Sequence, residues 1–298
     1  MSKKTVQFDY FEIWCEVEEG NSGKIKEKKF NLNAIFDKAS RINSKDTTYP
    51  YRGEKARIQS VVFDENSSIW EVQLLRLREI APPGLAKDDG SYEIFKLDDG
   101  EYIGESVSML YDKINYVLCI QRNFNAIPPS GVEEYLNNCI NKNPKIKLKP
   151  IIENKKGIEK INKNKIFRKM EIGLAMKDLD GIDTESGLGK TLNNLLKFGG
   201  TNVKIEISVG NAKRDRSLAP GLSEETINQL YKNVATTKLK ANVRDVDDTK
   251  VEKIDLFDDR LKDLDIFDVD RGMPLTHERV YPRLRAKYLT RLENGEFK

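Results

Sequence analysis

Basic side chains in the second half of the chain have types and spacings that suit phosphate binding. The segment "NAKRDRS" places three of them within four positions, and residues 141–170 contain eleven basic residues against two acidic ones. Near the C-terminus three more recur every four positions, so a helix would present them on one face. The residues that we expect to contact phosphate are Lys163, Lys165, Arg168, Lys190, Lys213, Arg214, Arg216, Arg283, Lys287 and Arg291.

Cations arranged in this way bind the phosphates of a nucleic-acid backbone, and such binding is salt-sensitive and largely independent of base sequence. The chain carries no signature of a helix-turn-helix, a zinc finger or an RNA-recognition motif, so nothing in it predicts that bases are read. We therefore predict non-specific binding to double-stranded DNA. Ordinary solubilising charges in a lysine-rich chain explain the same residues equally well.

The stretch "TESGLGKT" (184–191) resembles the end of a nucleotide phosphate-binding loop. That motif, GxxxxGK[ST], requires glycine where this chain has Thr184, and it requires a strand directly before the loop. Here an acidic stretch follows the preceding apolar segment. We therefore interpret Ser186 or Gly187 as a helix cap, with Lys190 in the first turn, and we expect no small-molecule nucleotide and no other cofactor. If Lys190 meets a phosphate, we expect one from a nucleic-acid backbone.

Acidic residues are concentrated between residues 244 and 270, where eleven of them face five basic ones. Carboxylates can hold Mg²⁺, so a metal-dependent nuclease is an alternative function, and a protein–protein interaction module is another. A solvated face, or a surface that mates with the basic segments, also explains the block. The aspartates concerned are Asp245, Asp247, Asp248, Asp255, Asp258, Asp259, Asp263, Asp265, Asp268 and Asp270.

The few histidine and cysteine residues exclude several chemistries. His277 is the single histidine, so two-histidine zinc sites and HExxH proteases are excluded. It lies at a predicted helix start, where we expect an ordinary solvated or capping role. Cys15, Cys119 and Cys139 are far apart in apolar surroundings, which predicts buried or half-buried free thiols. We expect no catalytic residue among them.

The elements that position these residues predict an α+β fold in two domains. In residues 1–148, "KTVQFDYFEIWCEVEE" is typical of a strand, and residues 49–79 predict two strands joined by an Asp-Glu-Asn-Ser-Ser turn. Residues 30–42 predict a helix, residues 116–121 an apolar strand, and "IPPSGVEEYLNNCINK" a second helix. Residues 1–148 therefore predict a β-rich α+β domain.

Residues 149–298 predict a second, basic α+β domain that would bind DNA. Its order is strand, helix, strand, helix, two strands and a final helix, with an antiparallel or mixed sheet. The clearest strand is "NVKIEISVG", in which apolar and polar residues alternate strictly. We expect the last helix to start after Tyr281, with Pro282 in its first turn.

Two features favour the cytoplasm. No run approaches the roughly 18 apolar residues that a membrane helix needs. The N-terminal stretch "MSKKTVQFDYFEIW" lacks the apolar core and the cleavage site of a secretory signal.

Four stretches are informative in their order along the chain: "KKFNLNAIFDKAS", "SIWEVQLLRLRE", a "GxxIGxxxxxLYD"-like element, and "LLKFGGTNVKIEISVGNAKRDRSLAPGLSEETINQL". Together they resemble phage-defence proteins of the RexA and KwaB type. The resemblance implies a cytoplasmic homodimer that binds DNA without sequence preference and senses phage replication, with a possible membrane-protein partner encoded nearby. The matching basic loop carries Lys213, Arg214 and Arg216. The element's residues are Gly100, Ile103, Gly104, Leu110, Tyr111 and Asp112.

Overall fold

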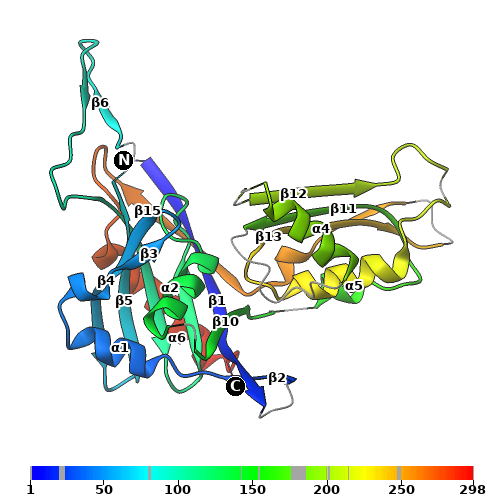
Figure 1. Cartoon of the computed structure of the whole chain (residues 1–298), viewed down its shortest axis with the longest axis horizontal. Coiled ribbons are helices and arrows are strands. Elements are labelled where there is room, and N and C mark those ends of the chain that lie inside the picture. The colour runs from blue at the N-terminus through cyan, green and yellow to red at the C-terminus, as the bar shows by residue number, and fades with distance from the viewer. Residues whose placement is uncertain are drawn as a thin grey trace. The chain divides into compact units, whose positions relative to one another are not determined.

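The chain has an α+β fold built as two compact units (Figure 1). Unit 1 comprises Met1–Leu148 together with Lys262–Lys298, and unit 2 comprises Lys149–Leu261. The sequence predicted domains at 1–148 and 149–298, whereas residues 262–298 belong to unit 1 in this division. The computed structural model describes residues 2–19, 24–79, 82–141, 143–153, 155–175, 186–198, 200, 202–213, 215–246 and 250–297.

The C-terminal segment belongs to unit 1 because it adds a strand to the sheet of that unit. Strand β15 (Lys262–Val269) pairs antiparallel with β1 (Ser2–Glu19), from Ser2 opposite Val269 to Asp9 opposite Lys262. The sequence predicted no strand here because acidic residues dominate the segment. Hydrogen bonds to a strand from the other end of the chain override that weak local propensity.

Unit 1 contains a nine-stranded sheet in the order β10-β1-β9-β8-β5-β4-β3, with β15 and β2 also pairing with β1. The predicted hairpin of two strands is confirmed as β4 (Glu54–Asp64) and β5 (Ile69–Arg78). A two-stranded sheet, β6 (Gly84–Ala86) with β7 (Tyr92–Ile94), stands apart. The other strands are β2 (Lys24–Lys29), β3 (Tyr49–Tyr51), β8 (Ile103–Asp112), β9 (Val117–Gln121) and β10 (Lys145–Pro150).

Helices cover both faces of the central strands of this sheet. On one face the ring of Phe36, in α1 (Asn33–Ser40), lies 5.7 Å from that of Tyr111. On the other, Tyr288 in α6 (His277–Glu293) donates a 2.5 Å hydrogen bond to Asp112. Successive strand residues point to opposite faces, so α1 and α6 lie on opposite sides of β8. Helix α2 (Pro129–Cys139) is the second helix predicted, and a 3-10 turn, η2 (Ser44–Thr47), precedes β3.

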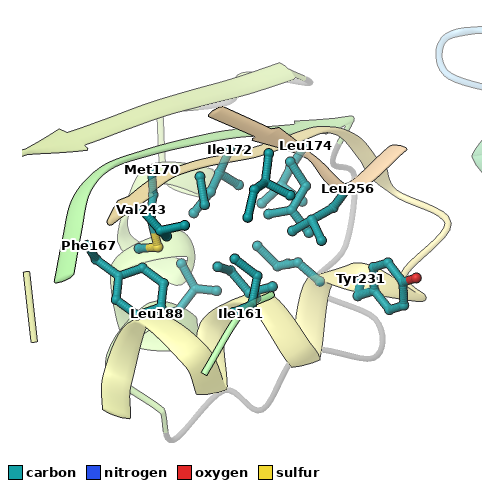
Figure 2. Close-up of a cluster of buried hydrophobic side chains, with 14 of the residues drawn as sticks. Ile161, Phe167, Met170, Ile172, Leu174, Leu188, Tyr231, Val243 and Leu256 are labelled. Atoms are coloured by element: carbon teal, nitrogen blue, oxygen red, sulfur yellow. The ribbon is translucent and has the colours of Figure 1, made fainter. Parts of the chain in front are cut away.

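Unit 2 is a four-stranded antiparallel sheet with helices on one face. Its strand order is β12-β11-β13-β14, and the strands are β11 (Ile166–Ala175), β12 (Asn202–Ser208), β13 (Thr236–Arg244) and β14 (Glu252–Asp255). Side chains of β11 and β13 pack against α4 (Gly187–Leu196) and α5 (Pro220–Tyr231) to form its core (Figure 2). Of the two arrangements predicted, an antiparallel or a mixed sheet, the structure has the antiparallel one. Two short elements, α3 (Lys156–Glu159) and η3 (Leu256–Asp259), complete the unit.

Two helix starts test the sequence interpretation. The "SGLGKT" segment is a helix start as predicted, since the Ser186 side chain accepts a 3.0 Å hydrogen bond from the Gly189 backbone N–H. Helix α6 starts at His277, at the helix start predicted there and before the start expected after Tyr281, and it contains Pro282 in its interior. The buried residues Val280, Leu284 and Tyr288 hold this helix on the sheet, which compensates for the hydrogen bond that proline cannot donate.

No helix in the described ranges is both long enough and apolar enough to cross a membrane.

Candidate nucleic-acid interface

The basic loop of unit 2, residues 209–217, connects β12 to α5 and is held by Arg168. Arg168 lies at a bulge in β11, between Phe167 and Lys169, where the register with β13 shifts. Its guanidinium donates hydrogen bonds to four backbone carbonyl oxygens of the loop. A single guanidinium group therefore provides the hydrogen-bond donors for four carbonyl oxygens of the loop. The acceptors are Gly210 at 3.4 Å, Ala212 at 2.9 Å, Lys213 at 2.7 Å and Arg216 at 2.8 Å.

Backbone hydrogen bonds fix both ends of this basic loop. The N–H of Val209 donates to the Arg168 carbonyl at 3.1 Å, and the N–H of Leu218 donates to the Phe167 carbonyl at 2.8 Å. The Ser217 hydroxyl accepts from the Phe167 N–H at 2.9 Å. The loop is therefore anchored to the first residues of β11. Because ordering a free loop on binding costs entropy, an anchored loop is better prepared to meet a ligand.

Two basic side chains of this loop lie in solvent. Lys213 and Arg216 are both exposed. Counting only the described part of the chain, neither side chain has a hydrogen-bond or ion-pair partner. Asp215 is the acidic residue between them, and Arg214 lies outside the described residues. The loop therefore offers two cations that are available to phosphate.

The antiparallel topology brings a second predicted group to the same end of the sheet. Strand β12 ends where β11 begins, as Ser208 opposite Lys169 shows, so the basic loop and the segment before β11 are neighbours. In that segment Lys163 is exposed, whereas Lys165 forms an ion pair with Asp245 at 2.5 Å. Lys163 thus adds to the positive charge at this end of the sheet. Lys165 is already neutralised.

The outward face of the unit 2 sheet carries paired charges. Lys169 lies 2.9 Å from Glu171 and 3.0 Å from Glu206, and Lys238 also binds Glu171. The hydrogen bonds from Lys238 and Lys169 lower the pKa of Glu171 to about 2, so its negative charge persists at neutral pH. The lysines of this face are largely neutralised by Glu171 and Glu206. The basic loop is therefore a stronger site for an anion than this face.

Helix α6 carries the remaining predicted cluster, and it belongs to unit 1. Arg283 binds both carboxylate oxygens of Asp265, at 2.7 and 2.8 Å. Arg291 binds both oxygens of Asp263, at 2.8 and 2.9 Å, and it also binds Glu296. Lys287 is half-exposed between them. Of the three α6 cations that were predicted to contact phosphate, two are therefore bound by carboxylates of unit 1.

The acidic block has several internal roles. One interpretation of this block was a surface that pairs with the basic segments of the chain. The ion pairs of Asp245, Asp263 and Asp265 confirm it, and Asp255 also forms an ion pair, with Lys240. Asp259 is buried and accepts hydrogen bonds from two backbone N–H groups of α3 and from the Tyr231 hydroxyl. Asp247 and Asp248 lie outside the described residues.

The described part of the chain offers no metal site to support the alternative of a metal-dependent nuclease. Among the described residues, no group of three or more His, Cys, Asp or Glu side chains is arranged to hold a metal ion. Two-metal chemistry needs converging carboxylates.

His277 is buried, so the expectation of an ordinary solvated or capping role was wrong. Its side chain bridges two strands: Nε2 lies 3.0 Å from a carboxylate oxygen of Glu71, and Nδ1 lies 2.8 Å from the Ser108 hydroxyl. These are the residue types of a hydrolase triad. However, Ser108 is completely buried, so no substrate can reach its oxygen. The arrangement fastens the start of α6 to the sheet.

The remaining predictions concern Lys190 and the cysteines. Lys190 is exposed in the first turn of α4, as expected. Cys15 and Cys119 are buried and Cys139 is half-buried, all as free thiols, which confirms their predicted state. The carbonyl acceptors of Arg168 had no signal in the sequence, because the bulge that directs this side chain depends on pairing between β11 and β13.

These features define an α+β protein of two units whose second unit exposes an anchored basic loop. The chain belongs to DUF6731, a family of unknown function that matches residues 1–296. No curated protein matches the sequence.

Proposed function

We propose that this protein binds double-stranded DNA without sequence preference, through backbone phosphates that contact the basic loop of unit 2. The observation that carries the proposal is the exposure of Lys213 and Arg216 on a loop whose backbone Arg168 holds in place. Exposed, uncompensated cations bind phosphate without reading bases. Lys163 is a further exposed cation of the same unit.

The composition of the loop favours duplex DNA over single strands. Proteins that bind single strands generally stack bases on aromatic side chains. The loop sequence "VGNAKRDRS" contains no aromatic residue. Its chemistry is limited to charge and hydrogen bonding, which suits a duplex backbone. Arg283 and Arg291 are left out of this proposed site because Asp265 and Asp263 bind them.

Measuring affinity for a short mixed-sequence duplex tests the proposal. The double variant Lys213→Ala/Arg216→Ala should bind about 3- to 30-fold more weakly, since an exposed charge contact contributes up to about 1 kcal/mol. A matched control is Lys197→Ala/Lys232→Ala, which removes two exposed cations of unit 2 outside the loop. If both double variants lose affinity equally, the loop is not the site. If the wild type does not bind DNA, the function is wrong.

The wider role that we attach to this activity is antiviral defence by a cytoplasmic protein with a possible membrane-protein partner. It is supported only by the resemblance to phage-defence proteins of the RexA and KwaB type. Phage plating efficiency on cells that express the wild type or Lys213→Ala/Arg216→Ala tests it. Protection that depends on the loop is expected, and equal plating with and without the protein would contradict the role.

A further inference from the structure

Strand β12 forms an edge of the unit 2 sheet. It pairs with β11 on one side, and no strand in the described ranges pairs with its other side. None of its seven residues is buried, and Ile207 is 39% exposed, in contrast to the buried apolar residues of β11 and β13. An edge strand of this kind presents unpaired backbone groups and apolar side chains, which favour pairing with another strand.

The backbone groups on the free edge belong to alternate residues. The N–H of Val209 donates to the carbonyl of Arg168, which places the 168–209 pair among the hydrogen-bonded pairs of the β11–β12 ladder. In an antiparallel ladder such pairs alternate with non-hydrogen-bonded ones. Residues 203, 205 and 207 therefore use their N–H and C=O groups toward β11. Residues 202, 204, 206 and 208 direct theirs outward.

The sequence of β12, "NVKIEIS", is complementary to itself when it is reversed. About its centre at Ile205, Lys204 matches Glu206, Val203 matches Ile207, and two polar residues match at the ends. Opposite charges and apolar pairs directly across an antiparallel ladder are stabilising, whereas like charges are destabilising. Lys204 and Glu206 are both exposed. The side chain of Glu206, whose carboxylate Lys169 binds, remains 61% exposed.

We propose that β12 pairs antiparallel with β12 of a second copy of this chain, about a two-fold axis that passes through the Ile205 pair. In this register Lys204 lies opposite the partner's Glu206, and the outward-directed backbone groups of both strands meet. Shifting the pairing by two residues in either direction keeps the outward-directed backbone groups opposite one another. It places Lys204 opposite the partner's Lys204, or Glu206 opposite the partner's Glu206, so both of these registers oppose like charges. The pairing joins two four-stranded sheets into one and needs no DNA.

The contact is small, so we expect a dimer that dissociates on dilution. A seven-residue ladder buries less surface than a standard stable interface. The two-fold arrangement closes after two copies, because each copy uses its single β12 edge. Sedimentation velocity over a range of concentrations should therefore show monomer and dimer without larger species.

Charge exchange tests the register. Lys204→Glu and Glu206→Lys should each shift the sedimentation equilibrium toward monomer, because each variant opposes like charges in its own homodimer. Mixing the two variants should restore dimer, because each then meets its complement. Far-UV circular dichroism must show that each variant is folded. A wild type that stays monomeric at every concentration would overturn the proposal, as would a dimer that neither variant weakens.

Disulfide trapping tests the position of the axis independently. Non-hydrogen-bonded antiparallel pairs bring Cα atoms to about 4.5 Å, within the range of a disulfide. Ile205→Cys should therefore cross-link to itself under mild oxidation. Ile207→Cys alone should not, but it should cross-link with Val203→Cys. The wild type controls for the three natural thiols. Equal cross-linking of Ile205→Cys and Ile207→Cys alone would overturn the register.

Discussion

The imidazole Nε2 of His277 lies 3.0 Å from the carboxylate of Glu71, which fastens the first residue of α6 to strand β5 of unit 1. A carboxylate can only accept a hydrogen bond, so Nε2 carries the proton. In the neutral ring Nδ1 then accepts from the buried Ser108 hydroxyl at 2.8 Å. The single histidine of the chain thus satisfies polar groups at the junction between helix and sheet.

Removing this imidazole should destabilise unit 1 without abolishing DNA binding. His277→Ala leaves the Ser108 hydroxyl unpaired in a buried site and opens a cavity, which should cost about 2–4 kcal/mol of unfolding free energy. Chemical denaturation measures it. In a double-mutant cycle with Ser108→Ala, the combined loss should be smaller than the sum, because the two side chains share one hydrogen bond. Strict additivity would show that the contact contributes nothing.

Arg168 should act on DNA binding by holding the loop. Arg168→Lys keeps the charge, but an ammonium group cannot match the fork that reaches four carbonyl oxygens. We expect weaker DNA binding and faster tryptic cleavage in the loop, at Lys213 or Arg216. The control is Lys165→Arg, which also exchanges one cation for another, at a nearby residue that pairs with Asp245 and does not hold the loop. Unchanged cleavage in Arg168→Lys would contradict the anchoring role.

The carboxylates that pair with α6 should make stability sensitive to acid. Burial alone would raise the pKa of Asp263, but hydrogen bonds from Arg291 and Tyr10 hold it below its ordinary value. Hydrogen bonding to Arg283 likewise lowers the pKa of Asp265. A carboxyl group with a lowered folded-state pKa stabilises the fold above its unfolded pKa of about 3.9 and loses that contribution as pH falls toward the folded value.

Asp263→Asn should therefore reduce stability at pH 7 by about 1–2 kcal/mol, since the pair is only partly buried. The same variant should lose less additional stability than the wild type between about pH 5 and pH 2. Urea unfolding at several pH values measures both effects. Asp268→Asn, at an exposed carboxylate of the same strand, is the control. Parallel pH profiles for wild type and Asp263→Asn would contradict the assignment.

Salt dependence should report how many phosphates the basic loop neutralises. For duplex DNA the logarithm of the binding constant falls with the logarithm of salt concentration by about 0.9 per contact. Contacts from Lys213, Arg216 and Lys163 predict a slope of about −2 to −3. Lys213→Ala/Arg216→Ala should reduce its magnitude by about 2. A slope unaffected by these substitutions would place the phosphate contacts elsewhere.

Local patterns predicted several elements correctly. The Ser186 hydroxyl caps α4 because a serine before an apolar helical stripe can accept from a free backbone N–H. Strict alternation identified β12, and the Asp-Glu-Asn-Ser-Ser turn identified the β4–β5 hairpin. These signals depend on residues close together in the sequence, so no tertiary information was needed.

The sequence by itself determined the α+β fold class and the high lysine content of this protein. It also determined that a basic loop follows a clearly alternating strand, and that the single histidine excludes two-histidine zinc sites. Only the tertiary structure decided which cations remain available. Strand β15 pairs with β1 and brings Asp263 and Asp265 to Arg291 and Arg283, which neutralises two of the three cations predicted on one face of the last helix. Electrostatic compensation depends on distance in space, and residues far apart in the chain supply it.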